Sequence, residues 1–213
     1  MITAALVLAD TEGLDTSVRG EPLLAHCVRG VAEAGCAGQL VVLAPERRVV
    51  TFEKILQAVP GTGQRCRVLP CSPHRAESIR SALDSLTGPA PDVVLLCEAA
   101  RAFVPPPVIR AVAETVFAGA PAAVPVLPVT DTVKLVDSRD VIIATEDRAR
   151  LRTVQGPLGC TPEVLREACE RGVDPVSEPP GTVRTIAGHQ NALRLATPFD
   201  VAVAEALLSE EQA

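Results

Sequence analysis

The sequence predicts an α/β fold with a mostly parallel sheet flanked by helices. Short, strongly apolar runs alternate with amphipathic segments of helix length, which is the pattern of successive βαβ units. Of the 213 residues, 47% are hydrophobic and 22% are charged, as in an ordinary globular protein. The apolar runs are strand-sized, and we find neither an internal repeat nor a linker that divides the chain. We therefore expect a single domain over residues 1–213.

Each strand-sized apolar run is expected to form a strand of this sheet, because a strand buried on both faces is a continuous hydrophobic stretch. The expected strands are residues 4–9, 40–43, 66–69, 93–97, 122–126 and 183–186. Helices are expected where apolar residues recur at helical spacing or where proline opens a first turn. The expected helices are residues 22–34, 49–58, a segment capped by Ser72-Pro73 that ends near residue 86, 106–117, 161–171 and 197–208.

Two more extended segments are expected to form a protruding two-stranded arm within residues 131–148. Residues 132–136 and 141–144 are separated by Asp137-Ser138-Arg139-Asp140, which has the composition of a tight turn.

Charge and cysteine usage exclude several classes of function. The net charge is −6, which gives no support to nucleic-acid or membrane-surface binding. The N-terminus lacks the basic start of a secretory signal, so we expect a cytoplasmic protein. Seven cysteines without a CxxC pair indicate reduced, mostly buried thiols, and three scattered histidines do not indicate a metal site.

The first strand-to-helix loop is where a doubly wound sheet usually binds nucleotide phosphates. Here Gly13 and Gly20 lie seven residues apart, with Asp10, Glu12 and Asp15 in the same loop. Such a loop is a poor cradle for a triphosphate, which needs closely spaced glycines and basic groups. The three carboxylates could hold a cation, although acidic side chains in an exposed loop are more often simply solvated.

Polar clusters follow the two strands at residues 93–97 and 122–126. Glu98 suits a ligand hydroxyl or Mg²⁺, and Arg101 suits phosphate oxygens, although the two could equally form a simple i, i+3 ion pair. The segment Asp131-Thr132-Val133-Lys134 offers groups for a polyol hydroxyl and, with Arg148, for a phosphate. Assuming that the two strands are neighbours, we expect both clusters to face one crevice. Alternatively, the second cluster is an edge arm with ordinary surface charges.

Five segments, in this order and spacing, together resemble the motifs of one enzyme family. They are Arg75-Ala76-Glu77-Ser78-Ile79, Cys97-Glu98-Ala99-Ala100-Arg101, Asp131-Thr132-Val133-Lys134, Thr145-Glu146-Asp147-Arg148 and Arg194-Leu195-Ala196. The chain resembles the 2-C-methyl-D-erythritol 4-phosphate cytidylyltransferases of the non-mevalonate isoprenoid pathway over nearly its whole length. The resemblance implies a Rossmann-like nucleotidyltransferase fold, and a homodimer formed through the arm.

The resemblance also implies cytidylyl transfer from CTP to a polyol phosphate with Mg²⁺, and it assigns roles to individual residues. Arg148 matches a catalytic arginine, and Arg19 is at best a displaced substitute for another. The substrate-binding candidates are Glu98, Arg101, Asp131, Thr132, Lys134 and Arg194, with Glu98 also the metal candidate. Arg75 and Ser78 match the nucleotide side, while Thr132 and Arg148 would serve the partner's site.

The departures from the family pattern concentrate on the nucleotide side. The family's Ala-Ala-Gly-x-Gly-x-Arg…Pro-Lys loop is shortened to residues 9–22, without its glycine pair, arginine or lysine. We interpret the chain as a divergent homologue whose transfer activity is impaired or lost. Two alternatives stay open. In one, transfer works with a rebuilt loop in which Arg19 or Asp10 takes over. In the other, the chain is a non-catalytic partner of an intact paralogue.

Overall fold

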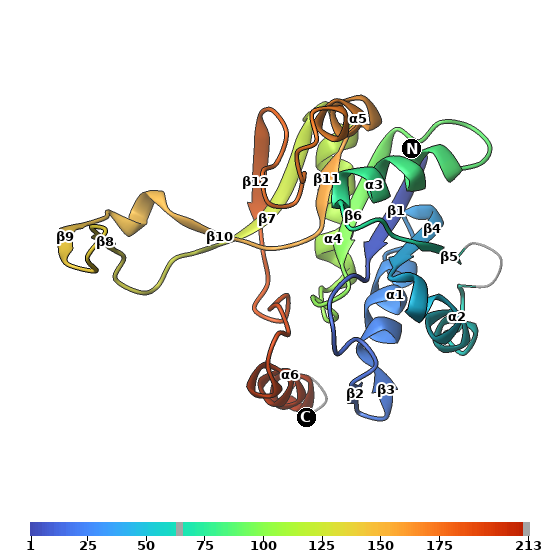
Figure 1. Cartoon of the computed structure of the whole chain (residues 1–213), viewed down its shortest axis with the longest axis horizontal. Coiled ribbons are helices and arrows are strands. Elements are labelled where there is room, and N and C mark those ends of the chain that lie inside the picture. Colours follow the sequence, from blue (N-terminus) through green and yellow to red (C-terminus); the bar gives the residue numbers. More distant parts are fainter. Residues whose placement is uncertain (63–65, 211–213) are drawn as a thin grey trace.

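The structure, a computed structural model, describes residues 1–62 and 66–210 and has one central sheet (Figure 1). Its strands run in the order β10-β7-β11-β6-β1-β4-β5, and β12 also pairs with β7. Adjacent strands are parallel except at β10 and β11, so the predicted mostly parallel sheet is confirmed. The strands are β1 (Thr3–Leu8), β4 (Ala37–Ala44), β5 (Cys66–Pro70), β6 (Val93–Glu98), β7 (Ala122–Pro128), β10 (Arg152–Val154), β11 (Leu158–Cys160) and β12 (Val183–Ala187).

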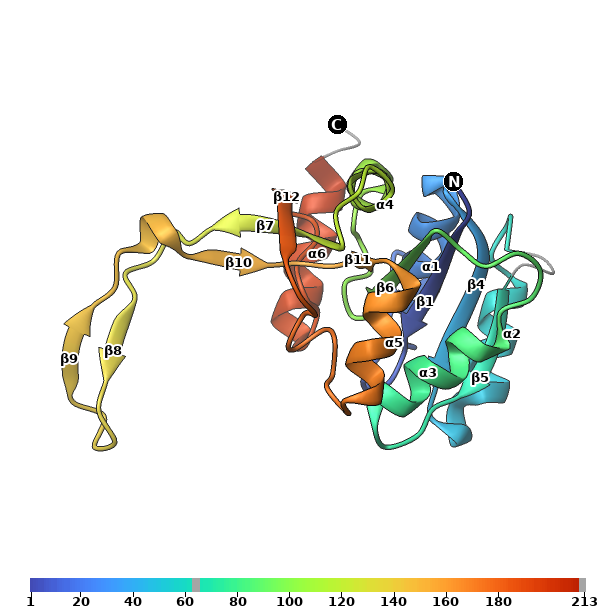
Figure 2. The ribbon, with the colours of Figure 1, turned by 90° about the horizontal axis from the view of Figure 1, so that it is seen from above.

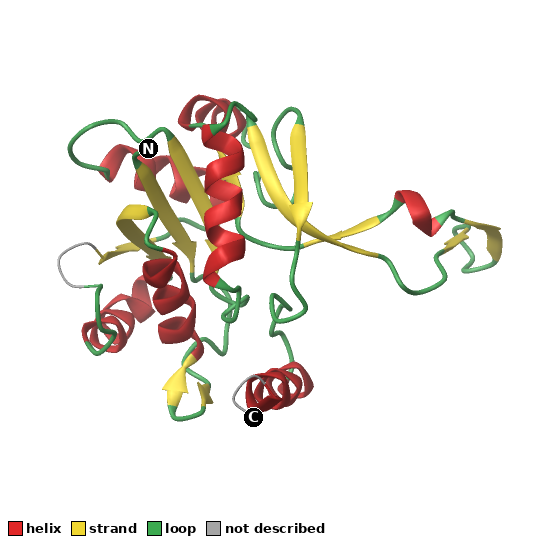
Figure 3. Cartoon of the chain, turned by 180° about the vertical axis from the view of Figure 1, so that it is seen from behind, coloured by secondary structure: helices red, strands yellow, loops and turns green. Residues whose placement is uncertain are grey.

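Helices cover both faces of the sheet, as Figure 3 shows from behind. Along β1, Ala5 and Val7 belong to one core, which α1, α2 and α4 complete, while Leu6 and Leu8 belong to the opposite core with α3 and α5. This alternation explains why β1, which is buried along its whole length, is almost entirely apolar. The helices are α1 (Leu23–Ala34), α2 (Val49–Gln57), α3 (Arg75–Ser85), α4 (Pro106–Phe117), α5 (Pro162–Glu170) and α6 (Pro198–Glu210), with the short 3₁₀ turns η1 (Glu46–Arg48) and η3 (Arg148–Arg150).

The helix ends follow local chemistry, with one correction. The Thr161 hydroxyl caps α5 by accepting a hydrogen bond from the N–H of Val164. The predicted cap of α3 at Ser72 is wrong, because that helix begins at Arg75 without a side-chain cap. The Ser72 hydroxyl instead donates to Glu77 at 2.6 Å, which stabilises the loop before the helix. In the part of the chain described, no helix is both long and apolar enough to cross a membrane.

The predicted arm is present and extends away from the body of the molecule (Figures 1 and 2). It contains the antiparallel strands β8 (Lys134–Val136) and β9 (Ile142–Thr145). The carboxylate of Asp137 accepts from the N–H groups of Arg139 and Val141, which closes the turn between them. The first strand is shorter than predicted, the second has the predicted length but begins one residue later, and the arm returns to the sheet at β10.

The prediction that the strand at 122–126 lies beside the strand at 93–97 is wrong. The three-residue strand β11 lies between β7 and β6, antiparallel to both. Its middle residue is glycine, and a Cβ atom at Gly159 would lie only 2.5 Å from Cγ1 of Val112 in α4. The close packing of α4 on the sheet therefore requires a glycine here, and this strand separates the two predicted clusters.

Candidate functional site

Three charged side chains, which we call the acceptor cluster, meet at the carboxyl end of β6: Glu98, Arg101 and Arg194. Nε of Arg101 lies 2.9 Å from Oε2 of Glu98, and Nε of Arg194 lies 3.5 Å from Oε1. Both Glu98 and Arg101 are mostly buried, whereas the Arg194 side chain is 43% exposed. One carboxylate thus contacts two guanidinium groups, and the cluster keeps one positive charge available to an anion.

Arg101 is held by more of the chain than its ion pair. Its Nη1 donates to the carbonyl of Ala192 at 2.9 Å, and its Nη2 donates to the carbonyl of Val154 at 3.3 Å. Arg101 therefore connects the end of β6 with β10 and with the segment before α6. Because its donors face protein acceptors, Arg194 is better placed than Arg101 to bind a phosphate.

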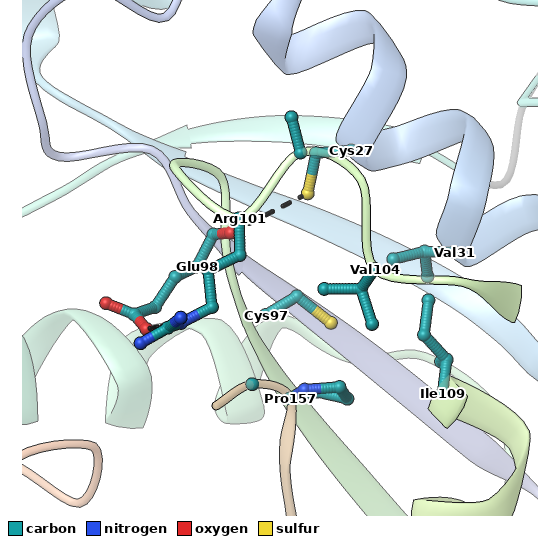
Figure 4. A pocket seen from close by; sticks show the side chains of 10 residues that line it. Cys27, Val31, Cys97, Glu98, Arg101, Val104, Ile109 and Pro157 are labelled. Carbon is teal, nitrogen blue, oxygen red and sulfur yellow. Dashed lines mark hydrogen bonds and ion pairs between the residues drawn. The ribbon is translucent and has the colours of Figure 1, made fainter. Parts of the chain in front are cut away.

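A small apolar cavity adjoins the acceptor cluster. Figure 4 shows Cys97, Val104 and Pro157 around it, with Glu98 and Arg101 lying together to one side. The cavity has a volume of about 10 Å³, which is close to the space that one water molecule needs. It is therefore too small for a substrate.

A larger cleft, which we call the nucleotide-side cleft, lies at the carboxyl ends of β1, β4 and β5. It has a volume of about 420 Å³, within the range of small-molecule sites. Its charged lining residues are Asp10, Glu46, Arg47 and Arg75, so its formal charge sums to zero. Open α/β sheets bind ligands at this end of their strands.

The loop between β1 and α1 is folded and anchored, not open. It contains a small hairpin of β2 (Ser17–Val18) and β3 (Glu21–Pro22). Arg19 and Gly20, with φ of 51° and 84°, form the two-residue turn, a geometry that favours glycine in the second position. Leu14 and Val18 are fully buried in the core. The loop is thus part of the folded core, as its composition did not predict.

The two residues predicted for the nucleotide side, Arg75 and Ser78, both line this cleft. Nε and Nη2 of Arg75 lie 2.9 and 2.8 Å from Oδ2 of Asp10, and Nη1 lies 3.0 Å from Oδ2 of Asp174. The buried hydroxyl of Ser78 accepts from the N–H of Ser72 at 2.8 Å, so it supports the loop before α3.

Electrostatics connect this cleft to the acceptor cluster. Burial alone would lower the pKa of Arg75, but its hydrogen bonds to Asp10, with the nearby charges of Asp10, Asp174 and Glu98, raise that pKa above its usual value. The two groups of residues share one edge of the sheet, because β1 and β6 are adjacent parallel strands and Leu8 pairs with Glu98.

The structure does not bring the remaining predicted residues to either group within one chain. Arg19 donates to the hydroxyl of Ser209 in α6 and lines a different cleft. Lys134 donates to Thr145 inside the arm, and Arg148 donates to the carbonyl of Thr130 at its base. The expected single crevice is therefore wrong for one chain, because β11 and the length of the arm separate these groups from Glu98.

The arm carries the other two substrate candidates as well. Asp131 and Thr132 are exposed and lie where the chain leaves β7 for the arm. In the dimer implied by the resemblance, such residues would act in the partner's site.

Asp174 contacts Arg75, and it was not among the residues predicted from the sequence. It lies in the segment after α5, 99 residues from Arg75, and no motif or periodicity connects the two positions. Its carboxylate also accepts from the N–H of Val176 at 3.0 Å and from the hydroxyl of Ser177 at 2.8 Å. The segment itself therefore holds Asp174 in place.

The residues at Glu98 do not fit a magnesium ion. Both carboxylate oxygens already face guanidinium groups, which would repel a cation. Within residues 1–62 and 66–210, no group of three or more His, Cys, Asp or Glu side chains is suited to hold a metal ion.

The sheet topology, with charged groups and a cleft at the carboxyl ends of its parallel strands, defines an α/β protein of the nucleotide-binding type. The comparisons with known proteins give the family. A model of the 2-C-methyl-D-erythritol 4-phosphate cytidylyltransferase family matches residues 9–210. The chain belongs to this family.

Relatives and solved structures agree with this assignment. A protein of this name from Saccharopolyspora erythraea is 42% identical over 90% of this chain and 88% of its own length. One from Streptomyces avermitilis is 36% identical over 92% and 84%. The crystal structure of the Thermus thermophilus protein of this name is similar with a TM-score of 0.75, at 25% identity over 98% of this chain and 100% of that chain. An Anaerococcus prevotii 4-diphosphocytidyl-2C-methyl-D-erythritol synthase has a TM-score of 0.83 at 18% identity, over 98% and 96%, and supports the fold alone.

Proposed function

We propose that this chain is a divergent cytidylyltransferase homologue that retains an acceptor site for a polyol phosphate, while transfer from CTP is impaired or lost. One observation carries the proposal. The loop that should cradle the triphosphate is a folded hairpin segment, and its first carboxylate, Asp10, pairs with Arg75.

The charge in the nucleotide-side cleft supports this proposal. Phosphoryl-type transfer depends on positioning and on neutralising the charge that develops on the phosphate oxygens. Arg47 and Arg75 are the basic groups lining the cleft, and they pair with Glu12 and Asp10. A triphosphate would compete with Asp10 for Arg75, whereas the exposed Arg47–Glu12 pair is a weaker obstacle.

The acceptor cluster supports retained binding of a small anionic polyol. Arg194 is half exposed and has one long contact, 3.5 Å, to Glu98, so its guanidinium can turn to a phosphate. The carboxylate of Glu98 can accept a hydrogen bond from a ligand hydroxyl.

We also propose that the chain forms a homodimer through the arm. Ile142 and Ile143 are 62% and 63% exposed, and Leu135, Val136 and Val141 are exposed beside them. An apolar surface of this kind on an extended hairpin favours burial against another chain. Deleting residues 131–148 should convert a dimer to a monomer in light scattering, and an intact dimer would contradict the arm assignment.

A working transferase is the second candidate, because the relatives that match most of the chain carry the name of the active enzyme. Calorimetric titration separates the two candidates. Wild-type protein is titrated with CTP and MgCl₂, and separately with 2-C-methyl-D-erythritol 4-phosphate. Binding of the polyol phosphate alone supports the proposal. Micromolar CTP binding, with release of pyrophosphate when CTP and the polyol phosphate are then combined, would establish the second candidate. No binding of either would favour a purely structural partner.

A further inference from the structure

The Arg75 cluster, which we define as Asp10, Arg75 and Asp174, bears on which ligands the nucleotide-side cleft can bind. Arg75 is the first residue of α3, and three of its nitrogens donate to carboxylates from two other segments. Asp10 follows β1, and Asp174 follows α5. The guanidinium is therefore occupied by anionic oxygens of the chain itself.

These carboxylates are held in place before any ligand arrives. Asp174 accepts from Val176 and Ser177 while it contacts Arg75. Asp10 follows Ala9, whose N–H donates to the carbonyl of Leu43 at 2.8 Å in the neighbouring strand. Only about a quarter of the Arg75 side chain and 30% of each carboxylate side chain are exposed, so solvent weakens these ion pairs less than it weakens pairs at the open surface.

The cluster also makes the charge around the cleft negative, which is unfavourable for an incoming anion. With Asp174 and Glu12, the partners of Arg75 and Arg47, added to the lining residues, the charged groups in and beside the cleft are four carboxylates and two guanidinium groups. An anion therefore loses attraction at Arg75 and meets repulsion from Asp10. A protein can reject one class of ligand by placing like charges, or charges that would be left unpaired, against it.

We propose that Asp10 is a specificity-determining residue that excludes nucleoside triphosphates from the nucleotide-side cleft by pairing with Arg75. This inference rests on the proposed function and names the group responsible for it. Asp174, in the segment after α5, pairs with Nη1 of the same guanidinium and so helps to hold it beside Asp10. The pairing of Asp10 with Arg75 does not reject ligands that lack a polyphosphate.

The test is calorimetric titration of the full-length chain with CTP and MgCl₂, and with inorganic tripolyphosphate. Asp10→Asn keeps the shape of the side chain and one acceptor oxygen but removes the charge. We expect it to tighten the binding of both probes at least about tenfold, which corresponds to about 1.4 kcal/mol. Asp174→Asn should also tighten binding, which provides a second variant if the first unfolds.

Asp15→Asn is the matched control. Asp15 lies in the same loop and pairs with Arg48 at 3.0 Å, but neither residue lines the cleft. It changes the net charge equally, so we expect CTP affinity within about twofold of wild type. Equal gains for Asp10→Asn and Asp15→Asn would overturn the inference in favour of a general charge effect.

The outcomes separate the inference from the proposed function. If neither wild type nor folded Asp10→Asn and Asp174→Asn binds the probes, the inference is wrong while impaired transfer stands. If wild type already binds CTP at micromolar concentration and releases pyrophosphate once 2-C-methyl-D-erythritol 4-phosphate is added, both are wrong.

Discussion

Replacing Arg101 with methionine should destabilise the fold by far more than an ordinary surface ion pair would. The side chain is only 15% exposed, and it donates to Glu98, Ala192 and Val154. Methionine keeps an unbranched stem of similar length but removes every one of these hydrogen bonds. The substitution therefore tests whether Arg101 connects β6, β10 and the segment before α6.

The expected loss follows from these contacts. A hydrogen bond that involves a charged group contributes about 1.5–3 kcal/mol. Removing one partner of a buried ion pair costs about 3–5 kcal/mol because the other charge is left unpaired. Here Glu98 keeps Arg194 at 3.5 Å as a second partner, so its carboxylate does not lose all compensation. We therefore expect a loss at the lower end, about 3 kcal/mol, a large part of the stability of a typical domain.

Urea unfolding followed by circular dichroism measures this loss, provided that the slope with denaturant is unchanged. Arg166→Met is the control. Arg166 lies 3.7 Å from Asp84, and both side chains are about half exposed, so we expect a loss below about 1 kcal/mol. If Arg101→Met costs no more than Arg166→Met, then Arg101 is not a structural connection, and its guanidinium should be reassigned to ligand binding alone.

Three further predictions follow from packing, capping and burial. Gly159→Ala should destabilise the chain by about 1–3 kcal/mol in urea unfolding, because its Cβ would lie 2.5 Å from Val112; a neutral result would show that α4 can shift. The pKa of Asp200 is lowered by hydrogen bonds, first from the N–H of Ala196 and then from the next residue. Its contribution to α6 should be present above the ordinary aspartate pKa and lost as pH falls through the lowered one. Amide protection at the start of α6, measured relative to the intrinsic exchange rate at each pH, should fall in acid in wild type but not in Asp200→Ala; equal pH dependence of protection in both would contradict this. Burial raises the pKa of the Cys27 thiol to about 12, so native protein at neutral pH should resist alkylation there, and rapid labelling by mass spectrometry would contradict this.

Most of the sheet and its helices could be predicted because their signals are local. Residues 106–117 form α4 with the predicted bounds, since proline at the start and helical apolar spacing agree. The strand β11 could not be predicted in this way. It has three residues, one of them glycine, and it is a strand because its neighbours pair with it. Its position in the order of strands follows from tertiary packing alone.

The candidate site also contains some contacts that could be predicted from the sequence and others that could not. Glu98 and Arg101 are three residues apart, so their pairing could be predicted from spacing. The partners of Arg75 are 65 and 99 residues away and come from segments without a motif. The sequence showed that the first loop lacks the closely spaced glycine pair and the lysine of the family pattern. It could not show that Asp10 faces Arg75, because that contact depends on how α3 packs on the sheet.

Turnover is the most direct test of the central proposal, that transfer from CTP is impaired or lost. Pyrophosphate release is measured with CTP, MgCl₂ and 2-C-methyl-D-erythritol 4-phosphate, with the Thermus thermophilus protein as the positive control. Loss of one preorganised donor to a developing charge reduces a rate by about 10²–10³-fold. Since more than one is missing, we expect a rate at least about 10³-fold below the control. A rate within about tenfold of the control would contradict the account, and it would mean that the rebuilt loop supports catalysis.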